Sequence, residues 1–264
     1  MSRLAPLFET CRGEGRAALV GYLPAGYPTV AEGTALLSAM IDGGCDLVEV
    51  GLPHSDPVMD GPTVEAAAHQ ALRNGFRVRD LFPTVEALAA KGGRAVVMTY
   101  WNPVHRYGVD AFARDLAAAG GLGVITPDLI PDEAEDWLAA AETHDLDRIF
   151  LVAPASTDER LVRAAKASRG FLYAASTMGV TGARETVSSM APALVGRLRQ
   201  HTDIPVGVGL GVRSGAQAAE VAAFADAVIV GSAFVSATAR GEQGVRDLAG
   251  ELAAGVRSAV VTGA

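Results

Sequence analysis

Short apolar runs and longer amphipathic runs alternate along the whole chain. The short runs are apolar almost throughout, which is typical of parallel strands buried on both faces. The longer runs are rich in alanine and repeat apolar residues at helical spacing, as Phe112, Leu116 and Ala119 do. The predicted strands are Ala17–Gly21, Leu47–Val50, Ala95–Thr99, Gly123–Ile125, Ile149–Val152, Phe171–Ala174, Pro205–Val208 and Ala227–Val230.

Helices are predicted between these strands and after the last one. Thr157 and Asp110 lie where helix-initiating residues are expected. The opening segment, Arg3–Arg12, reads as an extra helix before the first strand. The other predicted helices are Val30–Asp42, Val64–Asn74, Leu81–Ala90, Val109–Ala119, Pro131–Thr143, Asp158–Ala167, Val187–Gln200, Ser214–Ala223 and Val245–Ser258.

Repeated strand–helix–strand units predict a parallel sheet with right-handed crossovers. Eight such units in 264 residues fit a (β/α)8 TIM barrel, which typically has about 250 residues, with an extra N-terminal helix. Counting units does not distinguish a closed barrel from an open sheet. No linker or low-complexity tract divides the chain, so a single domain over residues 1–264 is expected.

Composition excludes several functional classes. The net charge is −8 and no basic stripe occurs, which argues against nucleic acid as a partner. Two cysteines rule out a disulfide framework, and the five histidines have no metal-type spacing. No apolar run reaches about 18 residues and no signal peptide is evident, so a cytoplasmic protein that does not enter a membrane is expected.

Two long loops that follow strands do not fit a minimal barrel. They are Gly51–Pro62, rich in proline and acidic residues, and Ser176–Thr186, rich in glycine and threonine. Loops after strands lie on the C-terminal face of a barrel, where active sites are built. Three late glycine-rich turns, Gly179–Gly182, Gly207–Val212 and Val230–Phe234, also follow strands and predict a phosphate site. Each turn alone is more consistent with a structural role, and the three together favour phosphate binding.

Glu49 is the best candidate for acid–base chemistry, because it is a carboxyl between Val48 and Val50 in an apolar strand. Burial raises a carboxyl pKa toward neutrality. The alternative is a structural ion pair. Asp60 ends the proline-rich loop and is either a second functional carboxyl or a turn residue. The two lysines, Lys91 and Lys166, lie outside the predicted strands, which argues against a Schiff-base aldolase.

Several motifs, in order along nearly the whole chain, resemble those of the tryptophan synthase alpha chain family. VEVGLPHSDPVMDGPTVEAA resembles its strand glutamate followed by a G-x-P-x-S-D-P-x-x-D-G-P loop. GYLPAGYPT, PDLIPDEAEDW, STMGVTG, PVGVGLGV and VIVGSAFV resemble its other segments. The resemblance implies a lyase of tryptophan biosynthesis that cleaves indole-3-glycerol phosphate into indole and glyceraldehyde 3-phosphate.

The resemblance also implies roles for individual residues. Glu49 would transfer the proton, and Asp60 would bind the indole N–H and stabilise the charged ring. Tyr173 would line the pocket near the glycerol phosphate, and Thr181 would help to close the site. The phosphate would be held by Gly182, Gly211, Gly231 and Ser232. The indole pocket would be formed by Tyr22, Met98, Tyr100, Ile125 and Leu210.

The family implies no metal and no cofactor in this chain, with pyridoxal phosphate expected only in a partner β subunit of an α2β2 tetramer. Partner docking is expected on Pro53–Asp60 and Trp101–Tyr107, whose apolar character exceeds that of a solvated loop. His54, Pro127 and Leu210 depart from the common family residues. The competing interpretations are another phosphate-binding barrel enzyme, such as an isomerase of a related pathway, and a non-catalytic scaffold subunit.

Overall fold

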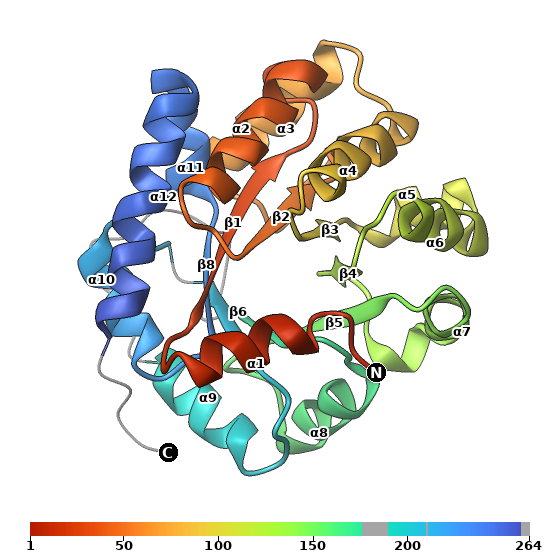
Figure 1. Ribbon diagram of the computed structural model, residues 1–264. Coiled ribbons are helices and arrows are strands. Elements are labelled where there is room, and N and C mark those ends of the chain that lie inside the picture. Colours follow the sequence, from red (N-terminus) through yellow and green to blue (C-terminus); the bar gives the residue numbers. More distant parts are fainter. Residues whose placement is uncertain (176–189, 210, 260–264) are drawn as a thin grey trace.

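The computed structural model describes residues 1–175, 190–209 and 211–259. Among these residues, eight parallel strands close into a barrel in sequence order, with helices outside it (Figure 1). The prediction of a closed (β/α)8 barrel is therefore confirmed. The strands are β1 (Ala18–Pro24), β2 (Leu47–Gly51), β3 (Ala95–Met98), β4 (Gly123–Thr126), β5 (Asp147–Val152), β6 (Leu172–Ala175), β7 (Val206–Gly209) and β8 (Ala227–Val230).

The helices around the barrel agree closely with the predicted ones. Thr157 and Ser214 cap their helices, because their hydroxyls accept the N–H of the residue three positions on. The helices are α1 (Ala5–Gly13), α2 (Val30–Asp42), α3 (Pro62–Arg73), η1 (Val78–Asp80), α4 (Leu81–Ala90), α5 (Trp101–Tyr107), α6 (Val109–Ala118), η2 (Pro131–Glu133), α7 (Glu135–Thr143), α8 (Asp158–Ala167), α9 (Met190–Arg199), α10 (Gly215–Ala222), α11 (Ser232–Ala237), η3 (Thr238–Arg240) and α12 (Gly241–Ser258).

Two predicted helices and one predicted loop need correction. Pro131–Thr143 is divided into η2 and α7, and the last helix begins at Gly241, four residues before the predicted start. Segment Trp101–Tyr107, expected to be a partner-facing loop, forms helix α5. Its apolar side chains pack on the chain itself: Trp101 lies edge-on to Trp137, Tyr107 packs on Phe82, and Val104 is buried.

Helix α1 closes the N-terminal end of the barrel (Figure 1). Its Leu7 and Phe8 join the buried cluster inside the barrel, and the Phe8 ring lies 5.9 Å from that of Phe171. The buried carboxylate of Asp147, at the start of β5, accepts hydrogen bonds from the Ser2 hydroxyl (2.7 Å) and the Leu4 N–H (2.9 Å). The extra N-terminal helix is therefore held in place by Asp147 and forms the floor of the barrel, meaning the layer that covers its N-terminal end.

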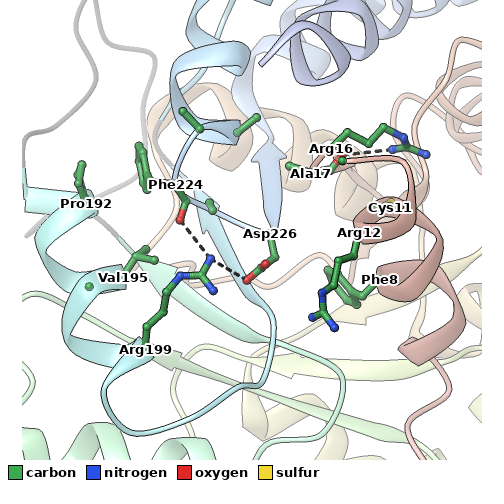
Figure 2. A pocket seen from close by; sticks show the side chains of 15 residues that line it. Phe8, Cys11, Arg12, Arg16, Ala17, Pro192, Val195, Arg199, Phe224 and Asp226 are labelled. Atoms are coloured by element: carbon green, nitrogen blue, oxygen red, sulfur yellow. Dashed lines mark hydrogen bonds and ion pairs between the residues drawn. The ribbon is translucent and has the colours of Figure 1, made fainter. Parts of the chain in front are cut away.

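A cavity of about 510 Å³ lies beside this floor, between α1, α9 and the turn that precedes β8 (Figure 2). Within it, Arg199 donates to the carbonyl of Phe224 (3.4 Å) and to Asp226 (3.3 Å). Asp226 also accepts the N–H of Val206 at the start of β7 (2.8 Å). These contacts join the starts of β7 and β8, and the predicted site residues do not line this cavity.

None of the described helices has the length and apolar character needed to cross a membrane. Within the same residues, His, Cys, Asp and Glu side chains form no group of three or more that could hold a metal ion.

Candidate active site

Glu49 lies on the inner face of β2, directly opposite Tyr22 of β1 and Val96 of β3. The side chain is 1% exposed, and neither carboxyl oxygen has a hydrogen-bond partner among the residues that the structure describes. The structural ion pair considered from the sequence is absent there. Burial, and secondarily the negative charge of Asp60, raises the pKa of Glu49 to about 8. Glu49 is therefore mostly protonated at neutral pH.

Asp60 ends the segment that leads from β2 into α3. Its main-chain N–H donates to the Pro57 carbonyl (3.2 Å), which forms a tight turn. Burial raises the pKa of Asp60 to about 6; the charge of Glu65 raises it further and His54 lowers it. At pH 7 Asp60 is mostly ionised while Glu49 is mostly protonated. Environments that separate two carboxyl pKa values in this way assign one group as the acid and the other as the charged stabiliser.

Tyr22 is buried and Tyr173 is half-buried, and both phenols lie within the electrostatic reach of both carboxyls. Burial raises their pKa values well above the usual range, and the charges of Glu49 and Asp60 raise them further. Both phenols therefore stay protonated at neutral pH. Two strand-end glycines make room for them: a methyl group at Gly51 would lie 2.5 Å from the Tyr22 ring, and one at Gly209 would lie 2.6 Å from the Tyr173 hydroxyl.

The glycines of β7 and of the turn after it also have packing and backbone roles, the structural alternative that their sequence left open. A methyl group at Gly207 would lie 3.0 Å from Phe171 and Ile229. Gly211 has φ +69°, the left-handed region that favours glycine, so a side chain there would strain the backbone regardless of any ligand. Gly231 is different, because its φ is −113° and an added methyl would only touch Tyr22 at 3.4 Å.

The other predicted site residues lie at the ends of barrel strands, in the interior cluster, or outside the described residues. Met98 ends β3 and pairs with Gly51 and Ile125 in the barrel register, and Ser232 begins α11 directly after Gly231. Ile125 is completely buried in the interior cluster, against which Met98 and Tyr173 pack. Thr181, Gly182 and Leu210, together with the rest of the predicted loop Ser176–Thr186, lie outside the described residues.

Tyr100 lies after β3 as the N-cap residue of α5, and sequence reasoning missed its contacts with the Asp60 segment. Its hydroxyl accepts the N–H of Met59 (3.0 Å), and its ring lies 5.0 Å from that of His54. The N–H of Trp101 donates to both oxygens of Asp128 (2.9 and 3.1 Å). Met59 precedes Tyr100 by 41 positions, so no local sequence signal indicates this bond.

The family profile, the related sequences and the solved structures all point to the same protein family. The sequence profile of the tryptophan synthase alpha chain family matches residues 8–260. The chain therefore belongs to the tryptophan synthase alpha chain family. The family member from Nocardia farcinica is 69% identical over 260 residues, covering 98% of each chain.

Solved structures agree with this membership. The structure of Mycobacterium tuberculosis tryptophan synthase superposes with a TM-score of 0.94 at 67% identity, covering 97% of this chain and 98% of the other. A mutant tryptophan synthase alpha subunit from Pyrococcus furiosus has a TM-score of 0.83 at 31% identity, covering 90% and 98%. The barrel is thus retained in this family where two thirds of the residues differ.

Proposed function

We propose that this chain cleaves indole-3-glycerol phosphate into indole and glyceraldehyde 3-phosphate, the alpha-chain reaction of tryptophan biosynthesis. The observation that carries the proposal is the buried Glu49 carboxyl, without a described hydrogen-bond partner, beside an ionised Asp60. The loop SDPVMDGP and membership of the alpha chain family favour this reaction over that of an isomerase, and a scaffold subunit would not need the two carboxyls. We also propose that residues 1–264 form one cytoplasmic barrel domain.

The carbon–carbon bond breaks in a sequence of proton transfers. Protonated Glu49 donates its proton to C3 of the indole ring, which places positive charge on the ring nitrogen. Ionised Asp60 accepts a hydrogen bond from that N–H and stabilises the charge. The bond between C3 and the adjacent glycerol carbon then breaks, and its electron pair returns to the ring.

The same step forms the aldehyde. The hydroxyl on the adjacent glycerol carbon loses its proton as it becomes a carbonyl, and the Glu49 carboxylate left by the first step takes that proton. Glu49 thereby returns to its protonated state. Because every step moves a proton between Glu49 and the substrate or an electron pair within the substrate, no redox cofactor is required. We expect pyridoxal phosphate only in a β subunit.

The indole ring and the phosphate of the substrate would be held by two separate groups of residues at the barrel mouth. Tyr22, Met98 and Tyr100 would contact the indole ring, with Leu210 and, from the interior cluster, Ile125. The phosphate would lie on backbone N–H groups at Gly182, Gly211 and Gly231 with the Ser232 hydroxyl, beside Tyr173. Thr181 would help to close the site.

Substituting Gly231 by alanine tests the phosphate end. The fold should tolerate the methyl group, because φ is negative and the nearest atom lies at 3.4 Å. We expect the dissociation constant of glycerol 3-phosphate, measured by calorimetry, to rise by about tenfold, since N–H···O bonds need about 2.7–3.2 Å. Unchanged affinity would remove Gly231 from the phosphate site. Ala233→Gly, two residues on, is the control.

We propose that the β subunit docks over the barrel mouth in an α2β2 assembly. Large apolar side chains that stay exposed in the described residues include Val58 on the Asp60 segment, 73% exposed, and Ile130 after β4. Val30 and Met190 begin helices that also start on this face. Exposed apolar groups gathered on one face mark an interaction surface.

Incubating the purified chain with indole-3-glycerol phosphate should release indole, detected by its absorbance or by chromatography. Adding the β subunit of the same organism should raise the rate, because docking completes and closes the site. Val58→Glu should weaken this stimulation, whereas Gln200→Glu, an exposed position after α9 at the opposite end of the barrel, should not. Absence of indole with and without the β subunit would overturn the proposed function.

A further inference from the structure

Asp60 belongs to a segment, Leu52–Asp60, that is tied to the rest of the described chain by few hydrogen bonds. Leu52 donates to the Met98 carbonyl (2.8 Å) at its beginning, and His69 contacts the Ser55 carbonyl (3.1 Å) in its middle. Most other bonds are internal, such as Asp56 N–H to Nδ1 of His54 (3.0 Å). Near Asp60, the segment is hydrogen-bonded to the rest of the described chain through Met59, whose N–H donates to the Tyr100 hydroxyl.

Tyr100 is itself held rigidly. The Thr99 hydroxyl donates to the Tyr100 carbonyl (2.8 Å), and the Thr99 N–H donates to Ile125 of β4 (3.1 Å). On the other side, Trp101 is bonded to Asp128 through its N–H. Tyr100 is therefore fixed to β4 and to the turn after it, so its side chain is a suitable anchor for a loosely held neighbour.

The phenol contacts the segment at two points. Its oxygen accepts the Met59 N–H, one residue before Asp60, and its ring packs against His54 near the start of the segment. Burial raises the pKa of Tyr100 to about 12, so the group is a neutral phenol at neutral pH and its oxygen remains a good acceptor without adding charge beside Asp60. The hydroxyl thus fixes the main chain that carries the Asp60 side chain.

We infer that Tyr100 is a positioning residue for the lyase reaction, in which its hydroxyl holds the Met59–Asp60 main chain so that the Asp60 carboxylate faces the indole nitrogen. This inference rests on the proposed function. It assigns the hydroxyl a purpose beyond that of an aromatic wall, which phenylalanine would supply equally well. Errors of about 1 Å in the placement of such a group cost up to about 100-fold in rate.

Tyr100→Phe removes the hydroxyl and keeps the ring. Hydrogen exchange at the Met59 amide, measured by NMR on the free chain, should accelerate about fivefold to tenfold, because one hydrogen bond is lost. We expect kcat to fall about tenfold with KM within about twofold. The pH profile of kcat/KM should rise at low pH as Asp60 ionises, and we call this rise the acid limb. In the variant it should move to lower pH, since a less fixed Asp60 is less buried and its pKa falls.

Tyr107→Phe is the matched control. Tyr107 lies on α5 and loses one hydrogen bond as well, to Asp115 (2.6 Å), but it does not contact the Asp60 segment. Unchanged Met59 exchange in Tyr100→Phe, or kcat and an acid limb equal to those of Tyr107→Phe, would overturn the inference. The exchange measurement needs no substrate, so it separates this outcome from a wild-type chain that releases no indole, which would overturn the proposed function instead.

Discussion

Glu49→Gln is expected to lower kcat for indole release by at least about 100-fold, the usual contribution of a positioned general acid. Glutamine has nearly the same shape as the protonated carboxyl but has no acidic proton to give to C3 of indole. Because Glu49 is buried and mostly neutral at pH 7, replacing it by a neutral amide should leave the fold intact. Single-turnover measurements with the purified chain give this value directly.

Binding at the phosphate end supplies the internal control for this variant. Affinity for glycerol 3-phosphate and the thermal unfolding midpoint should match the wild type, and Glu86→Gln, an exposed glutamate on α4, should retain full activity. If Glu49→Gln kept more than about a tenth of the wild-type kcat, general acid catalysis by Glu49 would be untenable.

Asp60→Asn should lower kcat by about 100-fold, because an amide cannot stabilise the positive charge that forms on the indole ring. Asparagine keeps the size of the side chain and one acceptor oxygen, so the turn at Pro57–Asp60 should persist. Asp136→Asn, an exposed position on α7, is the matched substitution and should be silent. A wild-type rate in Asp60→Asn would return Asp60 to the status of a turn residue.

The pH profile of kcat/KM distinguishes the two carboxyls. Activity should rise with pH through about 6 as Asp60 ionises, and fall with pH through about 8 as Glu49 loses its proton. In Asp60→Asn the acid limb should disappear. The basic limb should move to lower pH, because the Asp60 charge is one of the causes that raise the pKa of Glu49.

Glu65→Gln offers an independent check on the assignment of the acid limb. The charge of Glu65 raises the pKa of Asp60, so its removal should move that limb to lower pH. An acid limb that persists in Asp60→Asn would show that a different group titrates there.

Much of the barrel could be predicted from the chain because parallel strands and their helices leave separate periodic signals. The run Leu47–Val50 is apolar except for Glu49, and that exception identified the acid. Helix α5 was missed because WNPVHRY has proline at its third position and reads as a loop. Its aromatic residues suggested a partner surface; Trp101 and Tyr107 pack in part on their own barrel, and docking on this helix stays a prediction.

Local pattern could not predict the parts of the site that depend on long-range packing. The hydrogen bond between Met59 and Tyr100 joins two segments that are far apart in the chain. Nothing in the sequence of either segment indicates that it contacts the other. Gly209 belongs to a turn that resembles a phosphate site, yet only the folded barrel shows that Gly209 and Gly51 each make room for a tyrosine side chain. Likewise, the separation of the Glu49 and Asp60 pKa values depends on how deeply each carboxyl is buried, which sequence spacing does not specify.

Helix α1 has a further consequence for the fate of the product. Phe8 and Leu7 fill the barrel below the reacting carboxyl, so in the described part of the chain indole formed at Glu49 faces a sealed wall on one side. Indole is small and apolar and would be lost across membranes once it reached bulk water. Among the described residues, the direction that α1 leaves to the product is toward the barrel mouth, at the carboxyl ends of the strands, where the Asp60 segment lies. Whatever protein covers that mouth receives the whole output of the reaction, and the delivery needs no tunnel within this chain.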